Sequence, residues 1–212
     1  IRRLPLVPLL ALLAASAIAG RAPQRIDIHR RVLPNGLTVL VHERRIAPVV
    51  TTMIWYRVGS RDELPGETGI AHFLEHLMFK GTARYRKGEI DRITYRNGGS
   101  NNAFTYYDYT GYLFSFPRDR WQIALAIEAD RMRNTRFDPR EFEAERKVVM
   151  EERRIGEDDP AERLYEQLLA ITFTAHPYRN PVIGWMEDLR RLRIDQVKAF
   201  YDRYYVPANA SW

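Results

Sequence analysis

The sequence predicts an α+β fold, a two-layer sandwich in which helices pack on one face of a mostly antiparallel sheet. Alternating apolar runs flank Asn35-Gly36, and this dipeptide between such runs is the strongest short hairpin signal. Further along, helix-like and strand-like segments are mixed without the strict alternation that a parallel sheet requires. The 212 residues, of which 45% are hydrophobic and 28% charged, are enough for one sizeable core.

The expected strands are rich in β-branched and aromatic residues. After the hairpin, "VVTTMIWYRVG" (residues 49–59) predicts a strand, and a polar loop follows from Ser60 to Glu67. The segment "NNAFTYYDYTGYLFSF" (residues 101–116) predicts one or two strands that turn near Asp108. The final residues, "NASW", resemble the beginning of another strand.

The expected helices have apolar residues at helical spacing. They comprise residues 69–79, 88–99, 118–134, a stretch from 137 onward, 161–172 and 194–205, the last two joined by the loop "HPYRNPVIGW". Gly98 and Gly99 stop the second helix, because glycine readily adopts the left-handed cap conformation. The fourth has the clearest start, with Asp138 as N-cap, Pro139 at the first helical position and Glu141 completing a capping box.

Residues 1–19 have the layout of a secretory signal peptide. Two arginines precede an apolar run that closes on the small-residue pattern Ala17-Ile18-Ala19. A membrane anchor is the alternative, but the run is short for a span and contains two prolines. We expect cleavage near Ala19, a secreted or periplasmic location, and no stable membrane span after processing; an uncleaved protein would remain membrane-anchored. Because the sequence lacks an initiator Met and stops in an expected strand, we also expect it to belong to a longer protein.

Composition narrows the chemistry of any metal site. The chain has no cysteine, which excludes disulfides and thiolate ligands and leaves His, Asp and Glu as the strong ligands. The formal charge of +6 is scattered among acidic residues, so we expect a mixed, solvated surface and no nucleic-acid partner.

The stretch "GIAHFLEHLMF" carries the strongest functional signal. On a helix, His72 and His76 lie one turn apart on one face, with Glu75 beside them, so both imidazoles can reach one ion. A lone histidine is more often a satisfied core residue. Here two histidines and a carboxylate in apolar surroundings would be costly to bury without a partner, which favours a metal. The pattern H-x-x-E-H is an inverted form of the zinc-protease helix motif.

A zinc site of this kind needs a third protein ligand and one open position. The helix that follows Asp138 offers Glu145 and Glu152, seven residues apart on one face, with Val148 and Val149 expected on the core side between them. We predict Glu152 as the ligand. Glu151 is the alternative, although it should point more towards solvent. A solvated surface acid is the alternative for Glu145.

Glu75 is then free of the metal and placed to take a proton from a zinc-bound water. This is the role of a general base.

With these residues identified, the chain resembles the pitrilysin and insulinase family of zinc metallopeptidases, particularly the short bacterial members that are similar to the mitochondrial processing peptidase. Three segments carry the resemblance: "GIAHFLEHLMFKGT", "NGGSNNAFTYYDYTGYLF" and "ERKVVMEERR". It implies one zinc ion per chain, held by His72, His76 and Glu152, with Glu75 as base. Glu145 matches a family acid that supports the site, so it is included with the catalytic residues.

The resemblance also implies how a substrate binds and what is missing. Residues 20–212 would be the N-terminal catalytic zinc-binding domain, and a second homologous half or partner subunit would complete the chamber. Asn102, Ala103, Phe104 and Thr105 would form an edge strand to which an extended peptide or unfolded protein segment adds. For three nearby aromatic residues, simple packing in the sheet is an equal alternative: Tyr107, Tyr109 and Tyr112.

The sequence therefore predicts a zinc-dependent endopeptidase. Two alternatives use the same residues: a non-catalytic zinc-binding or assembly subunit of a larger complex, and a purely structural zinc site. The intact motif argues against the first, and an unliganded Glu75 beside three ligands argues against the second.

Overall fold

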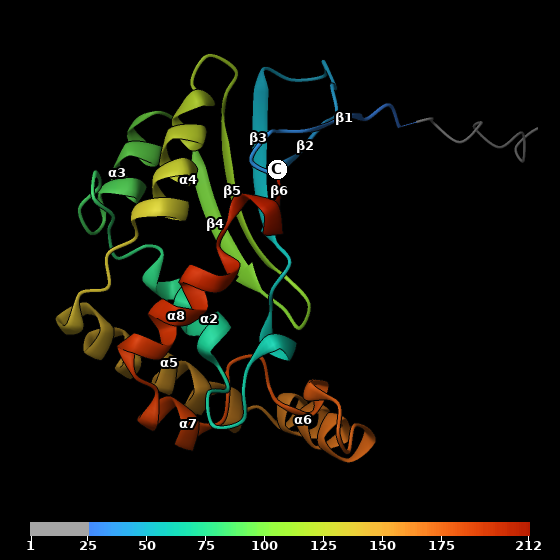
Figure 1. The fold of residues 1–212 in the computed structure, drawn as a ribbon, viewed down its shortest axis with the longest axis vertical. Helices are drawn as coiled ribbons and strands as arrows, with labels where there is room; N and C mark the ends of the chain where they lie inside the picture. The colour runs from blue at the N-terminus through green and yellow to red at the C-terminus, as the bar shows by residue number, and fades with distance from the viewer. Residues whose placement is uncertain (1–25) are drawn as a thin grey trace, which may run out of the picture.

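A computed structural model describes residues 26–212 of the chain (Figure 1). The signal peptide expected at residues 1–19 lies outside the described part and stays a prediction. Within residues 26–212, no helix is both long and apolar enough to cross a membrane.

The strands of residues 26–212 form one sheet with the order β1-β2-β6-β3-β5-β4. Neighbouring strands are antiparallel except β2 and β6, which are parallel. The predicted mostly antiparallel sheet is therefore confirmed, and β4 lies at an edge of it. The strands are β1 (His29–Val32), β2 (Thr38–Val41), β3 (Val49–Tyr56), β4 (Ser100–Thr105), β5 (Thr110–Pro117) and β6 (Ala210–Ser211).

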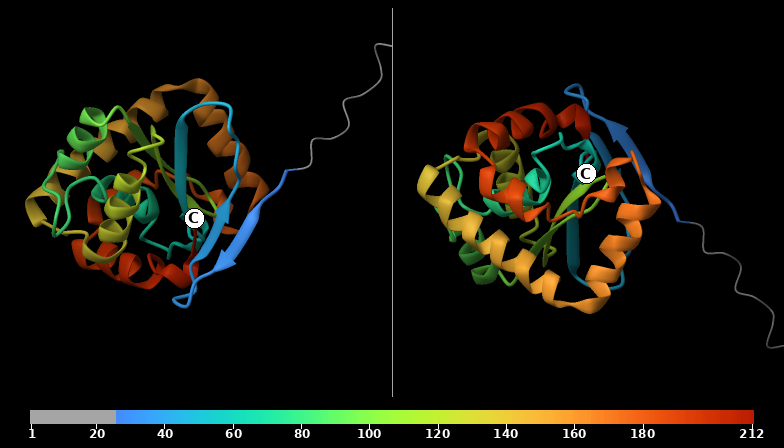
Figure 2. Two further views of the ribbon diagram at one scale, coloured as in Figure 1. Left: turned by 90° about the horizontal axis from the view of Figure 1, so that it is seen from above. Right: turned by 90° about the horizontal axis from the view of Figure 1, so that it is seen from below.

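Helices α2, α3, α4 and α8 lie on one side of this sheet, and Figure 2 shows the same two layers from above and below. The α+β class with helices on one face is thus confirmed. The α-helices are α2 (Ile70–Leu77), α3 (Glu89–Arg96), α4 (Gln122–Asn134), α5 (Pro139–Asp158), α6 (Pro160–Thr172), α7 (Met186–Arg191) and α8 (Ile194–Tyr204). Residues 26–212 also contain three short 3-10 turns, η1 (Ser60–Asp62) before α2, η2 (Pro177–Arg179) between α6 and α7, and η3 (Pro207–Asn209) after α8.

The predicted hairpin joins β1 to β2, with Val32 opposite Thr38. Its turn is closed by a hydrogen bond from the Leu33 N–H to the Leu37 carbonyl. Gly36 takes the left-handed conformation there, with φ of 88°. A side chain at this position would be strained and would also meet Ala208, so the glycine is required twice over.

Strands β4 and β5 form the second hairpin, which turns at residues 106–109 as expected near Asp108. Tyr112 on β5 is fully buried and Tyr107 nearly so, which supports the packing alternative for these two rings. Tyr109 is 37% exposed and contacts the rings of Trp55 and Phe104.

The core lies between the sheet and its helices. Side chains alternate along β5, so that Tyr112, Phe114 and Phe116 are buried against the helical layer. The buried hydrophobic residues of the described chain form two clusters. The larger one joins the sheet to α2, α5 and α8, and its most buried members include Ile54, Phe73 and Val197. The metal-binding candidates on α2 are therefore carried by the most deeply packed helix.

The predicted N-cap and first-turn proline of helix α5 are confirmed, but the predicted capping box is not complete. Asp138 accepts hydrogen bonds from the N–H groups of Arg140 and Glu141, and Pro139 occupies the first turn. The reciprocal half of the capping box is absent from the interactions of the described chain, because the Glu141 carboxylate pairs with Lys87 instead.

Two further details differ from the sequence predictions. Helix α7 was not predicted; it is only six residues long, too short for helical periodicity to stand out. The expectation that Val148 packs on the core side was also wrong, since it is 50% exposed while Val149 is fully buried. Val148 lies on the flank of α5 that carries the half-exposed Glu152, and this flank borders solvent.

Candidate metal centre

Helix α2 starts at a tightly packed glycine. Gly69 has φ of 88°, and a Cβ at this position would lie 2.4 Å from the Ile183 carbonyl oxygen. The carboxylate of Glu63 accepts hydrogen bonds from the N–H groups of Gly69 and Ala71, at 2.9 and 3.0 Å. These are free donors of the first helical turn, so Glu63 caps α2 from outside the helix. Burial nevertheless raises the pKa of Glu63 well above its usual range.

The helix buries its apolar residues and turns its polar ones towards α5. Five residues are buried: Ile70, Ala71, Phe73, Leu74 and Leu77. The side chains of His72 and His76 are 14% and 21% exposed, which leaves them accessible from one direction only. The predicted helix with one polar face is therefore what the structure contains.

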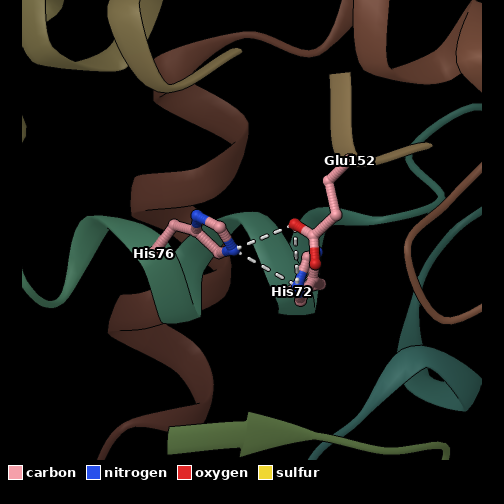
Figure 3. A group of neighbouring side chains, drawn as sticks. All are labelled: His72, His76 and Glu152. Carbon is pink, nitrogen blue, oxygen red and sulfur yellow. Dashed lines mark hydrogen bonds and ion pairs between the residues drawn. The ribbon is translucent and has the colours of Figure 1, made fainter. Parts of the chain in front are cut away.

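His72, His76 and Glu152 converge, as Figure 3 shows, from α2 and from the facing helix α5. The two Nε2 atoms are 3.3 Å apart. An oxygen of Glu152 lies 3.5 Å from the Nε2 of His76 and 3.9 Å from that of His72. The three ligand atoms of a tetrahedral zinc site, with bonds of 2.0–2.2 Å, lie roughly 3.3–3.6 Å apart. The donor set therefore fits zinc, with two separations inside this range and the 3.9 Å separation between Glu152 and His72 somewhat beyond it.

His72 is held in its neutral form. Burial, and secondarily the neighbouring His76, lower the pKa of His72 to about 3. Its Nε2 therefore has a lone pair available to a metal at neutral pH when the proton resides on Nδ1. The Nδ1 atom is buried and has no hydrogen-bond partner among the described residues.

His76 is oriented by a second carboxylate. Its Nδ1 lies 2.8 Å from the Oε1 atom of Glu145, while the Nζ of Lys80 lies 2.5 Å from Oε2. Burial favours the protonated form of Glu145, but the hydrogen bonds from His76 and Lys80 outweigh it and lower the pKa of this carboxyl. The ionised Glu145 accepts the Nδ1 proton of His76, which leaves Nε2 of that ring free to bind a metal.

Glu75 lies beside the converging atoms without joining them. Its Oε2 accepts a hydrogen bond of 2.5 Å from the hydroxyl of Thr105 on the edge strand β4. Burial raises the pKa of Glu75, while the Thr105 hydrogen bond and His76 act in the opposite direction. A carboxylate with a raised pKa is better suited to take up a proton near neutral pH.

A cleft of about 440 Å³ opens next to this group. His72, Thr105 and Glu152 line one end, and the acidic Asp159, Glu162 and Glu166 line the α5–α6 side. The convergent polar groups are thus reachable from solvent through a cavity large enough for part of a peptide.

The alternative ligand Glu151 lies apart from the site. Its carboxylate is exposed and pairs with Arg154 one turn along α5. The expectation that it points to solvent is therefore met.

The four residues expected to bind substrate do belong to the edge strand β4, but they face two ways. Ala103 and Thr105 are opposite Tyr112 and Thr110, whose side chains are buried in the helical layer. Phe104 lies on the other face of the sheet, where it contacts Trp55. Asn102 shares that face, because side chains alternate along a strand.

The outer edge of β4 can be traced from its hydrogen bonds. The Tyr106 N–H donates to the Tyr109 carbonyl, so alternation in the antiparallel pair directs the backbone groups of Ala103 and Thr105 away from β5. The Ala103 N–H accordingly donates to the side chain of Asn102. This edge therefore faces away from β5 and could pair with an added strand, once the Asn102 side chain releases the Ala103 N–H.

Sequence reasoning missed two residues of the site. Lys80 lies four residues after His76 inside the recognised motif, so an i, i+4 comparison would have found it. Glu63 belongs to the preceding loop, and no local pattern links it to the helix start six residues later.

Comparisons with known proteins agree with this geometry. The family model of the insulinase peptidases (family M16) matches residues 38–185. The chain is 38% identical over 202 residues to the zinc protease PqqE of Helicobacter pylori, covering 94% of this chain and 46% of that protein. It is 33% identical over 180 residues to an uncharacterized zinc protease, YmxG, of Bacillus subtilis, covering 85% and 44%. The chain therefore spans less than half the length of these relatives.

Solved structures give the same result. A protease from Helicobacter pylori aligns with a TM-score of 0.84 and 36% identity, over 88% of this chain and 45% of that one. The periplasmic protease PqqL from Escherichia coli aligns with a TM-score of 0.81 and 27% identity, over 91% of this chain and 22% of that one. The family match covers more than half of the chain and includes the whole converging site, so this chain belongs to the insulinase family of peptidases, M16.

Proposed function

We propose that this chain provides the zinc-binding half of an endopeptidase, with His72, His76 and Glu152 as ligands. The convergence of their three donor atoms carries the proposal. It is supported by the tautomer that Glu145 imposes on His76, and by relatives that are named zinc proteases. Bound zinc would supply Lewis acidity, which lowers the pKa of a coordinated water and polarises a carbonyl.

Glu75 is the general base. It is the one carboxylate of α2, it lies between the two histidines in the sequence, and its raised pKa suits proton uptake. It would accept a proton from the attacking water and return it to the amine that leaves. The hydroxyl of Thr105 fixes one of its oxygens, so that the other remains available for the transfer.

The substrate is a peptide or an unfolded protein segment in extended form. The outward backbone groups of Ala103 and Thr105 would pair with it as an added strand. Thr105 contacts Glu75 directly, so a strand paired at this edge would run past the catalytic carboxylate. Side chains on the other face would meet Phe104 and Trp55.

A second homologous half or partner subunit would close the chamber. The relatives' greater length supports this, because each is matched over less than half of its own chain. A periplasmic or secreted location is proposed from the signal-like residues 1–19 and from the periplasmic relative PqqL.

The test is Glu75→Gln in the protein at its natural length. We expect the variant to keep about one zinc ion per chain and to lose at least about 100-fold in peptide hydrolysis, the lower end of a general-base effect. Metal content by atomic emission and cleavage of a quenched peptide library are the measurements. Glu151→Gln is the matched control, since it makes the same change at an exposed acid of the neighbouring helix. Wild-type cleavage by Glu75→Gln would refute the proposal.

A further inference from the structure

The buried carboxylate of Glu145 uses both of its oxygens. Oε1 lies 2.8 Å from Nδ1 of His76, and Oε2 lies 2.5 Å from Nζ of Lys80. Only 6% of the Glu145 side chain is exposed, so water cannot replace either partner freely. With one partner on each oxygen, the carboxylate cannot rotate without breaking a charge-assisted hydrogen bond.

Lys80 reaches this position because the chain turns immediately after α2. The N–H groups of Phe79 and Lys80 donate to the carbonyls of His76 and Leu77, which continues the helical turn past its end. Lys80 therefore follows His76 on the same side, and Glu145 from α5 lies between them. The Lys80 side chain is 22% exposed, so its charge is only partly solvated.

A buried carboxylate that accepts only from a neutral imidazole would leave its charge uncompensated. Lys80 supplies the compensating charge, since the Lys80 ammonium and the neutral His76 ring are the two groups that the described chain pairs with the Glu145 carboxylate. The ammonium thus has a function that the imidazole cannot share once its Nε2 binds a metal.

We propose that Lys80 is a positioning residue for the metal centre, which acts through Glu145 to hold His76 with its Nε2 directed at the ion. The inference rests on the proposed zinc site. Lys80 touches neither metal nor substrate, and its effect therefore appears in metal affinity rather than as a direct catalytic contribution.

The chain contains a matched control. Lys87 pairs with Glu141 at 2.5 Å, which repeats the Lys–Glu pair one turn earlier on α5. That pair is more exposed, at 55% and 27%, and contacts no histidine. Lys87→Met therefore removes the same type of interaction from the same helix, at a lysine that pairs with Glu141 and interacts with Glu145 only electrostatically.

Zinc affinity is measured on the natural-length protein by competition with a chromophoric chelator. Lys80→Met should weaken zinc binding about 10-fold, the lower end for loss of an outer partner of a ligand. Lys80→Arg should recover most of the affinity, and Lys87→Met should leave it unchanged. Should Lys80→Met not fold, Lys80→Gln removes the charge but keeps a donor, and the same loss is expected.

A double-mutant cycle separates positioning from a merely structural role. In a Glu145→Gln background, Lys80→Met should cost little further zinc affinity. The effect of Lys80 passes through the Glu145 carboxylate, and this variant has already replaced that carboxylate by a neutral amide. Unchanged zinc affinity in Lys80→Met, or fully additive losses in the cycle, would overturn the inference. Zinc binding is measured without a peptide, so failure of the proposed peptidase activity is a separate result.

Discussion

The two sides of the proposed metal centre are built differently. On one side, His76 is fixed by Glu145, and Glu145 by Lys80, in a chain of short contacts that is largely buried. On the other side, His72 has a buried Nδ1 without a partner, and Glu152 is 51% exposed and contacts only the two imidazoles among residues 26–212. Half of the site is thus held by the fold itself, and the other half by whatever the donor atoms bind.

Because of this difference, the two sides should contribute differently to the stability of the folded protein and to its affinity for the metal ion. Residues on the held side contribute to the folded state with or without an ion, because their partners are protein groups. Residues on the open side gain their partner only from the ion, so their removal affects binding far more than folding.

The largest effect is expected from Glu152→Ala. Loss of this ligand should abolish stoichiometric zinc and reduce peptide hydrolysis at least about 1,000-fold, equivalent to about 4 kcal/mol. The free energy of unfolding of the zinc-free variant should lie within about 0.5 kcal/mol of the zinc-free wild type, as expected for an exposed side chain. Urea unfolding after chelation measures the second quantity, with Glu151→Ala as control. A large loss of zinc-free stability would show that Glu152 is held by the fold after all.

Glu145→Ala should show the reverse pattern. Removal of the carboxylate leaves a partly buried Lys80 and an Nδ1 donor without partners, and we expect about 3 kcal/mol of lost stability in the zinc-free protein. Zinc affinity should fall about 10- to 100-fold. Urea unfolding and chelator competition provide both numbers. Glu141→Ala is the control and should cost no more than about 1 kcal/mol, because its partner Lys87 is 55% exposed and Glu141 is itself less buried than Glu145.

The smallest effect concerns acid. The pKa of His72 is about 3 in the folded zinc-free protein, against an ordinary value of 6.5, so the unfolded chain binds more protons between these values. Stability should therefore fall as pH falls through 6.5. Between pH 7 and pH 5 this group should cost about 2 kcal/mol.

The measurement is the difference in this pH dependence between zinc-free wild type and zinc-free His72→Gln. The difference isolates one group from carboxyls such as Glu75, whose raised pKa acts in the opposite direction. Equal slopes for the two proteins would show that His72 titrates normally and that the open side is more solvated than its burial implies.

Local signals were enough to predict most of the fold. Asn35-Gly36 marked the first hairpin and Asp138-Pro139 the start of α5. The strand β4 followed from its composition, whereas its place at the edge of the sheet was implied by the family resemblance. These predictions succeeded because each structural feature is determined by residues that lie within a few positions of it in the sequence. Helix α7 was not predicted because six residues are too few to show the periodicity of apolar residues that marks a helix.

For the site, helical spacing placed His72 and His76 on one face. Glu152, on another helix, was predicted from the need for a third ligand and from the family resemblance, and the structure brings it near both histidines. It could not distinguish Val148 from Val149, since both lie near that face and only the neighbouring helix decides which is buried. The contact of Thr105 with Glu75 depends on tertiary packing across a long sequence separation, which no spacing rule captures. Lys80 could have been noticed from its place four residues after His76, but its pairing with Glu145 on another helix could not.

The side chain of Asn102 folds back onto the neighbouring main chain, and this contact affects how readily the edge strand pairs with other polypeptides. A free sheet margin invites self-association, and natural proteins limit that hazard by occupying its donors. Here the Ala103 donor is already engaged by an amide 2.9 Å away. A polypeptide that pairs with this edge must first displace that amide, so it exchanges one hydrogen bond for another at this position. A weakly held chain therefore gains no net stabilisation here, whereas a chain bound at several other points can still pair.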